Sequence, residues 1–128
     1  MTAQTAAGMV AEAKQRIENL SVDQLASEMK DGDVILVDIR EPEERSTAGI
    51  IPGSEHAVRG MLEFYADSTS PYHRPAFETD RRIVLYCASG GRSALAADAL
   101  KRLGYSRVAH LEGGLKAWTA AGKNLMPV

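Results

Sequence analysis

The residue with the most reactive side chain is Cys87, the one cysteine among 128 residues. It follows a short apolar run and precedes a loop of small residues with one basic residue: Ala88, Ser89, Gly90, Gly91, Arg92 and Ser93. Small residues and two glycines allow the backbone to curl so that successive N–H groups point toward one centre. A helix beginning near Arg92 adds free N–H groups and the positive end of its dipole. Both effects favour the thiolate, the nucleophilic form of cysteine.

A structural role for Cys87 is the competing interpretation, because a lone cysteine at the end of a buried strand is most often an inert apolar side chain. Such a cysteine needs no inward-facing amides, and Gly90-Gly91 carries a conformational cost unless an unusual backbone is required. Arg92 adds a permanent charge and a fork that suits an oxyanion. We therefore predict that Cys87 is ionised and reachable, and that it acts together with Arg92.

The elements around this loop alternate between strands and helices. Apolar runs at 34–37, 83–86 and 108–111 lack the two-residue alternation of a half-exposed strand, which is typical of strands buried on both faces. Helices are predicted from Ser21, where Gln24 completes a capping-box pattern, from Arg92, and from Gly113-Gly114. The pattern predicts an α/β fold with a central parallel sheet covered by helices on both sides.

The start of the chain has a helical pattern of its own. Val10, Ala13, Ile17 and Leu20 share one face of a helix over residues 1–20. We predict an N-terminal helical extension, 1–20, and one domain, 21–124. The extension packs on that domain or on a second subunit, so a monomer and a homodimer both stay open.

Composition excludes several classes of function. The net charge is -2 and the charged residues are balanced in sign, which argues against a general nucleic-acid binder. No run of about 20 apolar residues is present, so no membrane span is predicted. One cysteine cannot form an internal disulfide, and a reducing cytoplasm is the expected location.

The segment from Cys87 to Ser93 resembles the active-site loop of single-domain rhodaneses. Three more stretches are similar to segments of that family and follow in the same order. Residues 37–44 match V-D-x-R-x-x-x-E, 49–54 are similar to G-H-I-P-G-A, and 111–118 match L-x-G-G-x-x-x-W. Any one of these motifs alone would be weak, but together they are specific.

The resemblance implies a five-stranded parallel sheet flanked by helices, with Cys87 at the floor of a shallow bowl. It implies a sulfurtransferase in which the thiolate takes the outer sulfur of a donor, such as thiosulfate, and passes the resulting persulfide sulfur to an acceptor. Catalytic roles fall to Cys87 and Arg92, and substrate binding to the loop residues Ala88, Ser89, Gly90, Gly91 and Ser93. No metal or organic cofactor is expected. The partners are a small-molecule donor and an acceptor that is cyanide in an assay, or a thiol or protein in the cell.

Two departures from the family concern the donor. Ile50 stands where the family usually has histidine, and the loop residues before Arg92 carry no charge. Thiosulfate-preferring members often have a basic side chain in this loop. We therefore expect thiosulfate to be a poor donor, and a persulfide or a partner protein to be the natural one.

Two other functions compete with sulfur transfer. A rhodanese-fold module that only binds proteins would need neither Cys87 nor Arg92. The related dual-specificity phosphatases and arsenate reductases carry Cys-x5-Arg, whereas this chain has Cys-x4-Arg, a smaller ring that suits one sulfur atom. The loop length therefore favours sulfur over phosphate.

Asp38 and Arg40 follow a predicted strand and are expected to pair and brace the active loop without touching substrate. Glu43 and Glu44 are interpreted as solvated charges.

The remaining side chains of interest receive mostly structural interpretations. Trp118, His56 and His110 are predicted to be core or strand-edge residues. His73 and Arg74 lie in a long loop, 67–75, and a role in donor recognition is a hypothesis for them.

Overall fold

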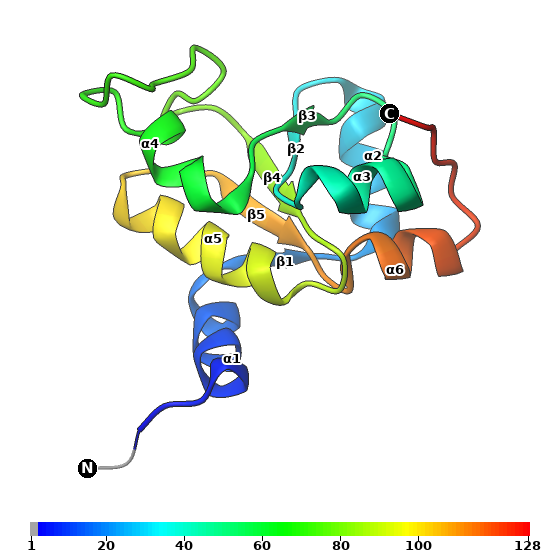
Figure 1. Cartoon of the computed structure of the whole chain (residues 1–128), viewed down its shortest axis with the longest axis horizontal. Helices are drawn as coiled ribbons and strands as arrows, with labels where there is room; N and C mark the ends of the chain where they lie inside the picture. The colour runs from blue at the N-terminus through cyan, green and yellow to red at the C-terminus, as the bar shows by residue number, and fades with distance from the viewer. Residues whose placement is uncertain (1–2) are drawn as a thin grey trace.

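The computed structural model describes residues 3–128. Its elements follow one another as α1 (Ala6–Arg16), β1 (Glu18–Leu20), α2 (Val22–Asp31), β2 (Ile35–Asp38), α3 (Pro42–Ala48), β3 (Glu55–His56), the 3-10 turn η1 (Arg59–Met61), α4 (Leu62–Ala66), β4 (Ile83–Tyr86), α5 (Gly91–Arg102), β5 (Val108–Leu111) and α6 (Gly114–Ala120). The five strands form one parallel sheet in the order β1-β5-β4-β2-β3 (Figure 1). The predicted α/β class and five-stranded parallel sheet are confirmed.

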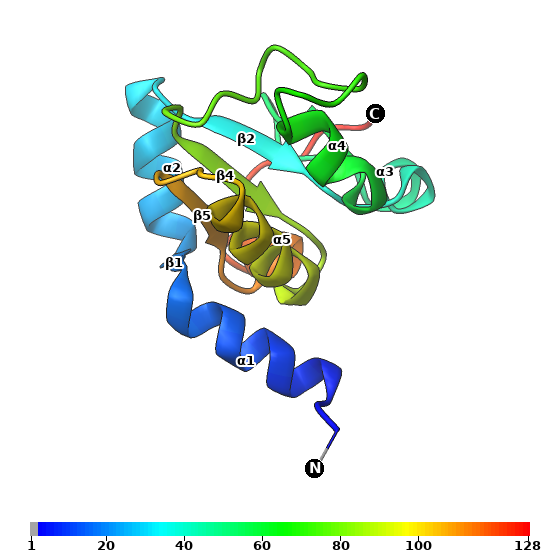
Figure 2. The same cartoon turned by 90° about the vertical axis from the view of Figure 1, so that its left-hand side faces the viewer.

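Helices cover both faces of the sheet, as predicted (Figures 1 and 2). One core cluster joins the sheet to α1, α4 and α5 through residues such as Ala13, Leu62 and Leu100. The other joins it to α2 and α6 through residues such as Leu25 and Trp118. β4 is central and fully buried, because it contributes side chains to both clusters. Burial on both faces explains why residues 83–86 are an apolar run without alternation.

Local sequence signals account for several element boundaries. Ser21 caps α2, and its hydroxyl and the Gln24 side chain complete the predicted capping box. Gly32 ends the same helix with φ at 83°, a left-handed conformation that glycine adopts at little cost. Pro42 starts α3, where a missing N–H costs nothing.

The helix predicted over residues 1–20 is shorter in the structure. Residues 1–2 lie outside the described part of the chain, residues 3–5 are not helical, and the last part of the prediction is wrong. α1 ends at Arg16, and Glu18–Leu20 instead forms the edge strand β1, paired in parallel with β5. The helical spacing continued through Ile17 and Leu20, but the free edge of β5 offers Glu18–Leu20 a ladder of backbone hydrogen bonds. α1 packs on α5 of its own chain, where the Arg16 guanidinium donates to both oxygens of Asp98.

The C-terminal segment returns to the loop between α3 and β3, where Met126 exchanges backbone hydrogen bonds with Ile50 in an isolated antiparallel bridge. In the part of the chain that the structure describes, no helix is both long and apolar enough to cross a membrane.

Candidate active site

Cys87 lies directly after β4, at the carboxyl end of the sheet. Its Sγ accepts hydrogen bonds from the backbone amides of Gly90, at 3.2 Å, and Ser93, at 3.4 Å. The sulfur also lies 3.5 Å from the Ser93 hydroxyl oxygen, to which the thiol donates. Gly90, with φ at 101°, is the N-cap of α5, so the helix N-terminus points at the sulfur as well. The loop therefore directs backbone amides at the sulfur, as the sequence predicted, and the binding of an anion or substrate there stays a prediction.

The prediction that the sulfur is reachable is wrong for this arrangement, because Cys87 is only 1% exposed. Its side chain belongs to the core cluster beneath α1, α4 and α5, together with residues such as Ala94 and Ala97. The amides around Sγ and the contact of Cys87 with the core have the same cause, because Cys87 lies at the end of a strand that is buried on both faces. In this structure the sulfur is therefore almost inaccessible from solution.

The loop rests on the backbone of a second glycine pair, Gly113-Gly114. A Cβ on Gly114 would lie 2.6 Å from the carbonyl oxygen of Cys87, well inside van der Waals contact. The same carbonyl accepts a hydrogen bond from the Leu115 amide, and the Ala88 carbonyl accepts one from the Lys116 amide. The start of α6 thus supports the Cys87 loop, and the close approach of the two backbones explains why residue 114 is a glycine.

Arg92 pairs with a carboxylate that the sequence analysis did not assign to it, and its catalytic role beside Cys87 stays a prediction. Its guanidinium donates two hydrogen bonds to Glu44 of α3, at 2.7 and 2.8 Å. This pairing lowers the pKa of Glu44 to about 2, with help from the Glu41 amide, and raises the pKa of Arg92. Arg92 therefore links α5 to α3 beside the loop. Its side chain is 41% exposed, and the carboxylate of Glu44 balances its charge.

Glu44 was interpreted as a solvated charge, and that interpretation is wrong. Its carboxylate also accepts a hydrogen bond from the Glu41 amide, so a capping box at the start of α3 fixes it toward Arg92. Helical periodicity gave no sign of this contact. The family segment V-D-x-R-x-x-x-E did contain the signal, because Glu44 is its last residue.

Asp38 and Arg40 pair as predicted, and both are buried. The carboxylate of Asp38 also accepts from the Tyr86 hydroxyl, at 3.1 Å, and from Arg45, while Arg40 donates to the Gly49 carbonyl. Burial acts against the charge on Asp38, but the hydrogen bonds of Arg40 outweigh it and lower the pKa of that carboxyl. The network reaches Cys87 through Tyr86, its chain neighbour. The bracing role stays a prediction.

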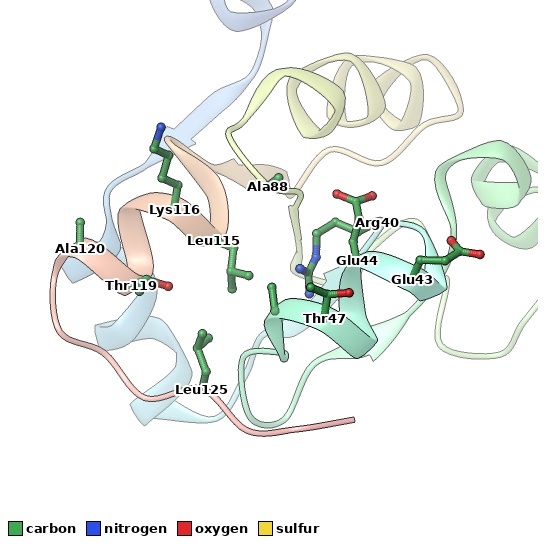
Figure 3. Close-up of a pocket in the computed structure, with 11 residues that line it drawn as sticks. Arg40, Glu43, Glu44, Thr47, Ala88, Leu115, Lys116, Thr119, Ala120 and Leu125 are labelled. Carbon is green, nitrogen blue, oxygen red and sulfur yellow. The ribbon is translucent and has the colours of Figure 1, made fainter.

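An open cavity of about 800 Å³ lies between α3 and α6, next to the loop (Figure 3). Ala88 lines it from the loop, and Arg40 and Glu44 line it from the side of α3. Figure 3 shows Leu115 of α6 and Leu125 facing Thr47 across this space. Cys87 itself does not line the cavity, although its neighbour Ala88 does.

Behind the sulfur, a chain of hydrogen bonds leads away from the cavity. Ser93 Oγ lies 2.8 Å from His110 Nδ1, and His110 Nε2 lies 2.8 Å from Asn19 Oδ1. His110 is fully buried, and burial lowers its pKa to about 4, so the imidazole is neutral. His110 was predicted to be a satisfied core residue, which is confirmed, but its link to Cys87 through Ser93 was not anticipated. Residues on three separate elements form this chain, and no sequence spacing joins them.

The other predicted side chains lie elsewhere. Trp118 is a core residue, as predicted, and donates its indole N–H to the Asn124 carbonyl. His56 bonds the Arg40 carbonyl at the edge of the sheet. His73 bonds the Phe77 carbonyl, and Arg74 donates to the carbonyl of His56. These contacts hold the long loop onto the body, and the donor-recognition role of His73 and Arg74 stays a hypothesis.

Within residues 3–128, no group of three or more His, Cys, Asp or Glu side chains is placed to hold a metal ion.

The fold and the site define a class: parallel α/β domains that hold a cysteine among backbone amides after the central strand. Comparison with known proteins shows which family of this class the chain belongs to. The sequence model of the rhodanese-like domain matches residues 21–121. This chain therefore belongs to the rhodanese-like family. A protein of Allochromatium vinosum named sulfurtransferase is 38% identical over 90 residues, which are 70% of this chain and 76% of that protein.

Solved structures agree on the fold. A structure from Rhodopseudomonas palustris, described as a protein of unknown function and possible tyrosine phosphatase, is 42% identical, with a TM-score of 0.92 over 98% of this chain and 97% of that one. A thiosulfate sulfurtransferase from Pseudomonas aeruginosa has a TM-score of 0.76 over 95% of this chain and 22% of its own, at 24% identity. At that identity the second likeness concerns the fold alone.

Proposed function

We propose that this protein is a sulfurtransferase that carries a sulfane sulfur as a persulfide on Cys87. The observation that carries the proposal is the pair of backbone amides, from Gly90 and Ser93, that donate to Cys87 Sγ. Amides at a helix N-terminus stabilise negative charge on sulfur, and both the thiolate and the persulfide are anions. A sulfur that was only a core side chain would gain nothing from them.

The reaction has two steps, and a covalent intermediate divides one transfer into two easier ones. In the first, the Cys87 thiolate attacks the outer sulfur of the donor. A new S–S bond forms, and the old bond breaks with its electrons leaving on sulfite, for thiosulfate, or on a thiolate, for a persulfide donor. In the second, an acceptor nucleophile takes the outer sulfur, and the Cys87 thiolate is regenerated. The amides of Gly90 and Ser93 stabilise the sulfur anion throughout.

A persulfide or a partner protein suits this site better than thiosulfate. The loop carries no charge before Arg92, and Glu44 balances the charge of Arg92 itself. A doubly charged donor therefore meets little net positive charge. The cavity beside Ala88, with its apolar wall of Leu115 and Leu125, offers the donor or acceptor a route toward the loop. Since the one thiol has no second cysteine to resolve it, the sulfur leaves to another molecule, and a reducing cytoplasm is the expected setting.

The decisive experiment is intact-mass spectrometry of the purified protein after incubation with thiosulfate, polysulfide or glutathione persulfide, each used separately. We expect the mass to increase by one sulfur with polysulfide and glutathione persulfide, and more slowly with thiosulfate. Cys87→Ser is the matched control and should gain nothing. Absence of an adduct from all three donors would contradict sulfur transfer.

The same protein sample tests the two competing functions. The low exposure of Cys87 favours a module that only binds proteins, and a folded protein that never takes up sulfur would support that function. Hydrolysis of an aryl phosphate that is lost in Cys87→Ser would instead support the phosphatase description given to the Rhodopseudomonas palustris structure.

A further inference from the structure

The hydrogen-bond chain behind Cys87 has an orientation that the structure itself determines. Asn19 donates its side-chain N–H groups to the carbonyls of Lys14 and Ile17, which directs its Oδ1 toward His110. Because Oδ1 can only accept, His110 Nε2 carries the proton. In the neutral imidazole, Nδ1 is then a free acceptor, and the Ser93 hydroxyl 2.8 Å away donates to it. Every donor in the chain thus points away from the sulfur.

We propose that His110 is the proton acceptor for Cys87 and acts through the Ser93 hydroxyl. The thiol proton passes to Ser93 Oγ while the Ser93 hydroxyl proton passes to His110 Nδ1. The S–H bond breaks, a new N–H bond forms, and the neutral pair of thiol and imidazole becomes a pair of thiolate and imidazolium with no change in net charge. His110 does not touch the sulfur, so it is a positioning residue for the proton rather than a member of the reacting group.

The burial of the chain explains why such a route is needed. Cys87 and Ser93 are 1% and 0% exposed, and His110 is 0% exposed, so bulk water has little access to the thiol proton. Burial also opposes a charged imidazole, but the new thiolate and the Glu112 carboxylate, 3.5 Å from His110 Nε2, both favour it. Lys14 of α1 bonds Glu112 and acts in the opposite sense. Asn19 of β1 and Ser93 of α5, the other polar groups against the ring, are uncharged.

The inference deepens the proposed function, since it assumes that Cys87 is the reacting group, but its test does not require sulfur transfer. Methyl methanethiosulfonate is a small reagent that modifies thiolates, and its rate of reaction with Cys87 can be followed by intact mass across pH. His110→Asn keeps a side chain that can bond Ser93 but cannot accept a proton. Ser93→Ala removes the bridging hydroxyl, and it supplies the test if the first variant does not fold.

We expect each variant to react about 100- to 10,000-fold more slowly than the unaltered protein near pH 7, a size typical of lost general-base assistance. The difference should shrink as the pH rises, because hydroxide then takes the thiol proton without help from His110. The double variant should be no slower than either single one, because both remove the same proton route. Arg107→Ala, which precedes β5 at the end of the sheet away from Cys87, is the control and should leave the profile unchanged.

A rate reduced by the same factor at every pH would overturn the proposal, because that result describes a purely structural residue. An unchanged rate, or a wild-type protein that does not react at any pH, would overturn it as well. Failure of the proposed function can be distinguished from failure of this proposal. If the pH profile is as expected but no sulfur adduct forms, the proton route through His110 stands and the proposed sulfur transfer is wrong.

Discussion

His110 should make the protein acid-labile by an amount that the structure allows us to work out. Burial lowers the pKa of this imidazole from 6.5 to about 4. Between these values the unfolded chain binds a proton on His110 and the folded chain does not. The free energy of unfolding therefore falls as the pH falls through this window, and it is unaffected by His110 above about pH 6.5. One pKa unit corresponds to about 1.4 kcal/mol, so the loss by about pH 4 is about 3 kcal/mol.

The assay is urea denaturation followed by circular dichroism at about pH 7 and about pH 4, for the unaltered protein and for His110→Asn. The variant cannot titrate at this position, so its stability should fall by about 3 kcal/mol less between the two conditions. Leu25→Ala, which opens a cavity in the other core cluster, is the control: it lowers stability at both pH values and keeps the full acid-dependent fall. Equal falls in the unaltered protein and His110→Asn would refute a neutral, buried imidazole.

Three further predictions concern the ion pairs and the glycine support. Asp38→Ala leaves the Arg40 guanidinium buried without its carboxylate, and urea titration should show a loss of about 3–5 kcal/mol. Arg92→Ala should slow sulfur loading, measured by intact mass, while costing no more than about 1 kcal/mol, because its pair with a carboxylate is partly exposed. Arg107→Ala, at the opposite end of β5, is the control and should leave loading unchanged. If Arg92→Ala takes up sulfur as fast as Arg107→Ala, Arg92 has no role in the site. Gly114→Ala should lower both melting temperature and loading, since its Cβ would collide with the carbonyl of Cys87; a normal melting temperature would contradict the observed close packing.

The sequence predicted the centre of the fold well, because its signals are local. β4 is an apolar run without alternation, and α2 is bounded by a capping box at Ser21 and a left-handed glycine at Gly32. The cradle around Cys87 was predictable for the same reason. Its amides come from residues within six positions of the sulfur, so the nearby sequence showed which amides could face it, although the start of α6 also supports the loop.

The edge strands were harder to predict. β1 and β3 contain three and two residues, too few to show a period, and β1 continues the helical spacing of α1. They form because the neighbouring strands present free hydrogen-bonding edges. The number of strands came from the family resemblance and not from the pattern of these segments.

The contacts that control the site are long-range. Glu44 is separated from Arg92 by 48 positions and Asn19 from His110 by 91. Glu44 has an ordinary local role in a helix cap and Asn19 lies in an edge strand, and these local roles hide the second contact. The prediction of an exposed Cys87 was wrong for a related reason. The loop sequence indicates where the amides point, but the packing of α1, α4 and α5 determines what covers the sulfur.

The proposed function requires that Cys87 both accepts a sulfur atom and gives it away. The most direct test is a single turnover: load the protein, remove all free donor, add cyanide, and measure both thiocyanate and the intact mass of the protein. We predict about one equivalent of thiocyanate per loaded protein and a return to the unloaded mass, since the intermediate is a persulfide on one thiol. Sulfur that stays on the protein, with no thiocyanate formed, would contradict transfer through Cys87.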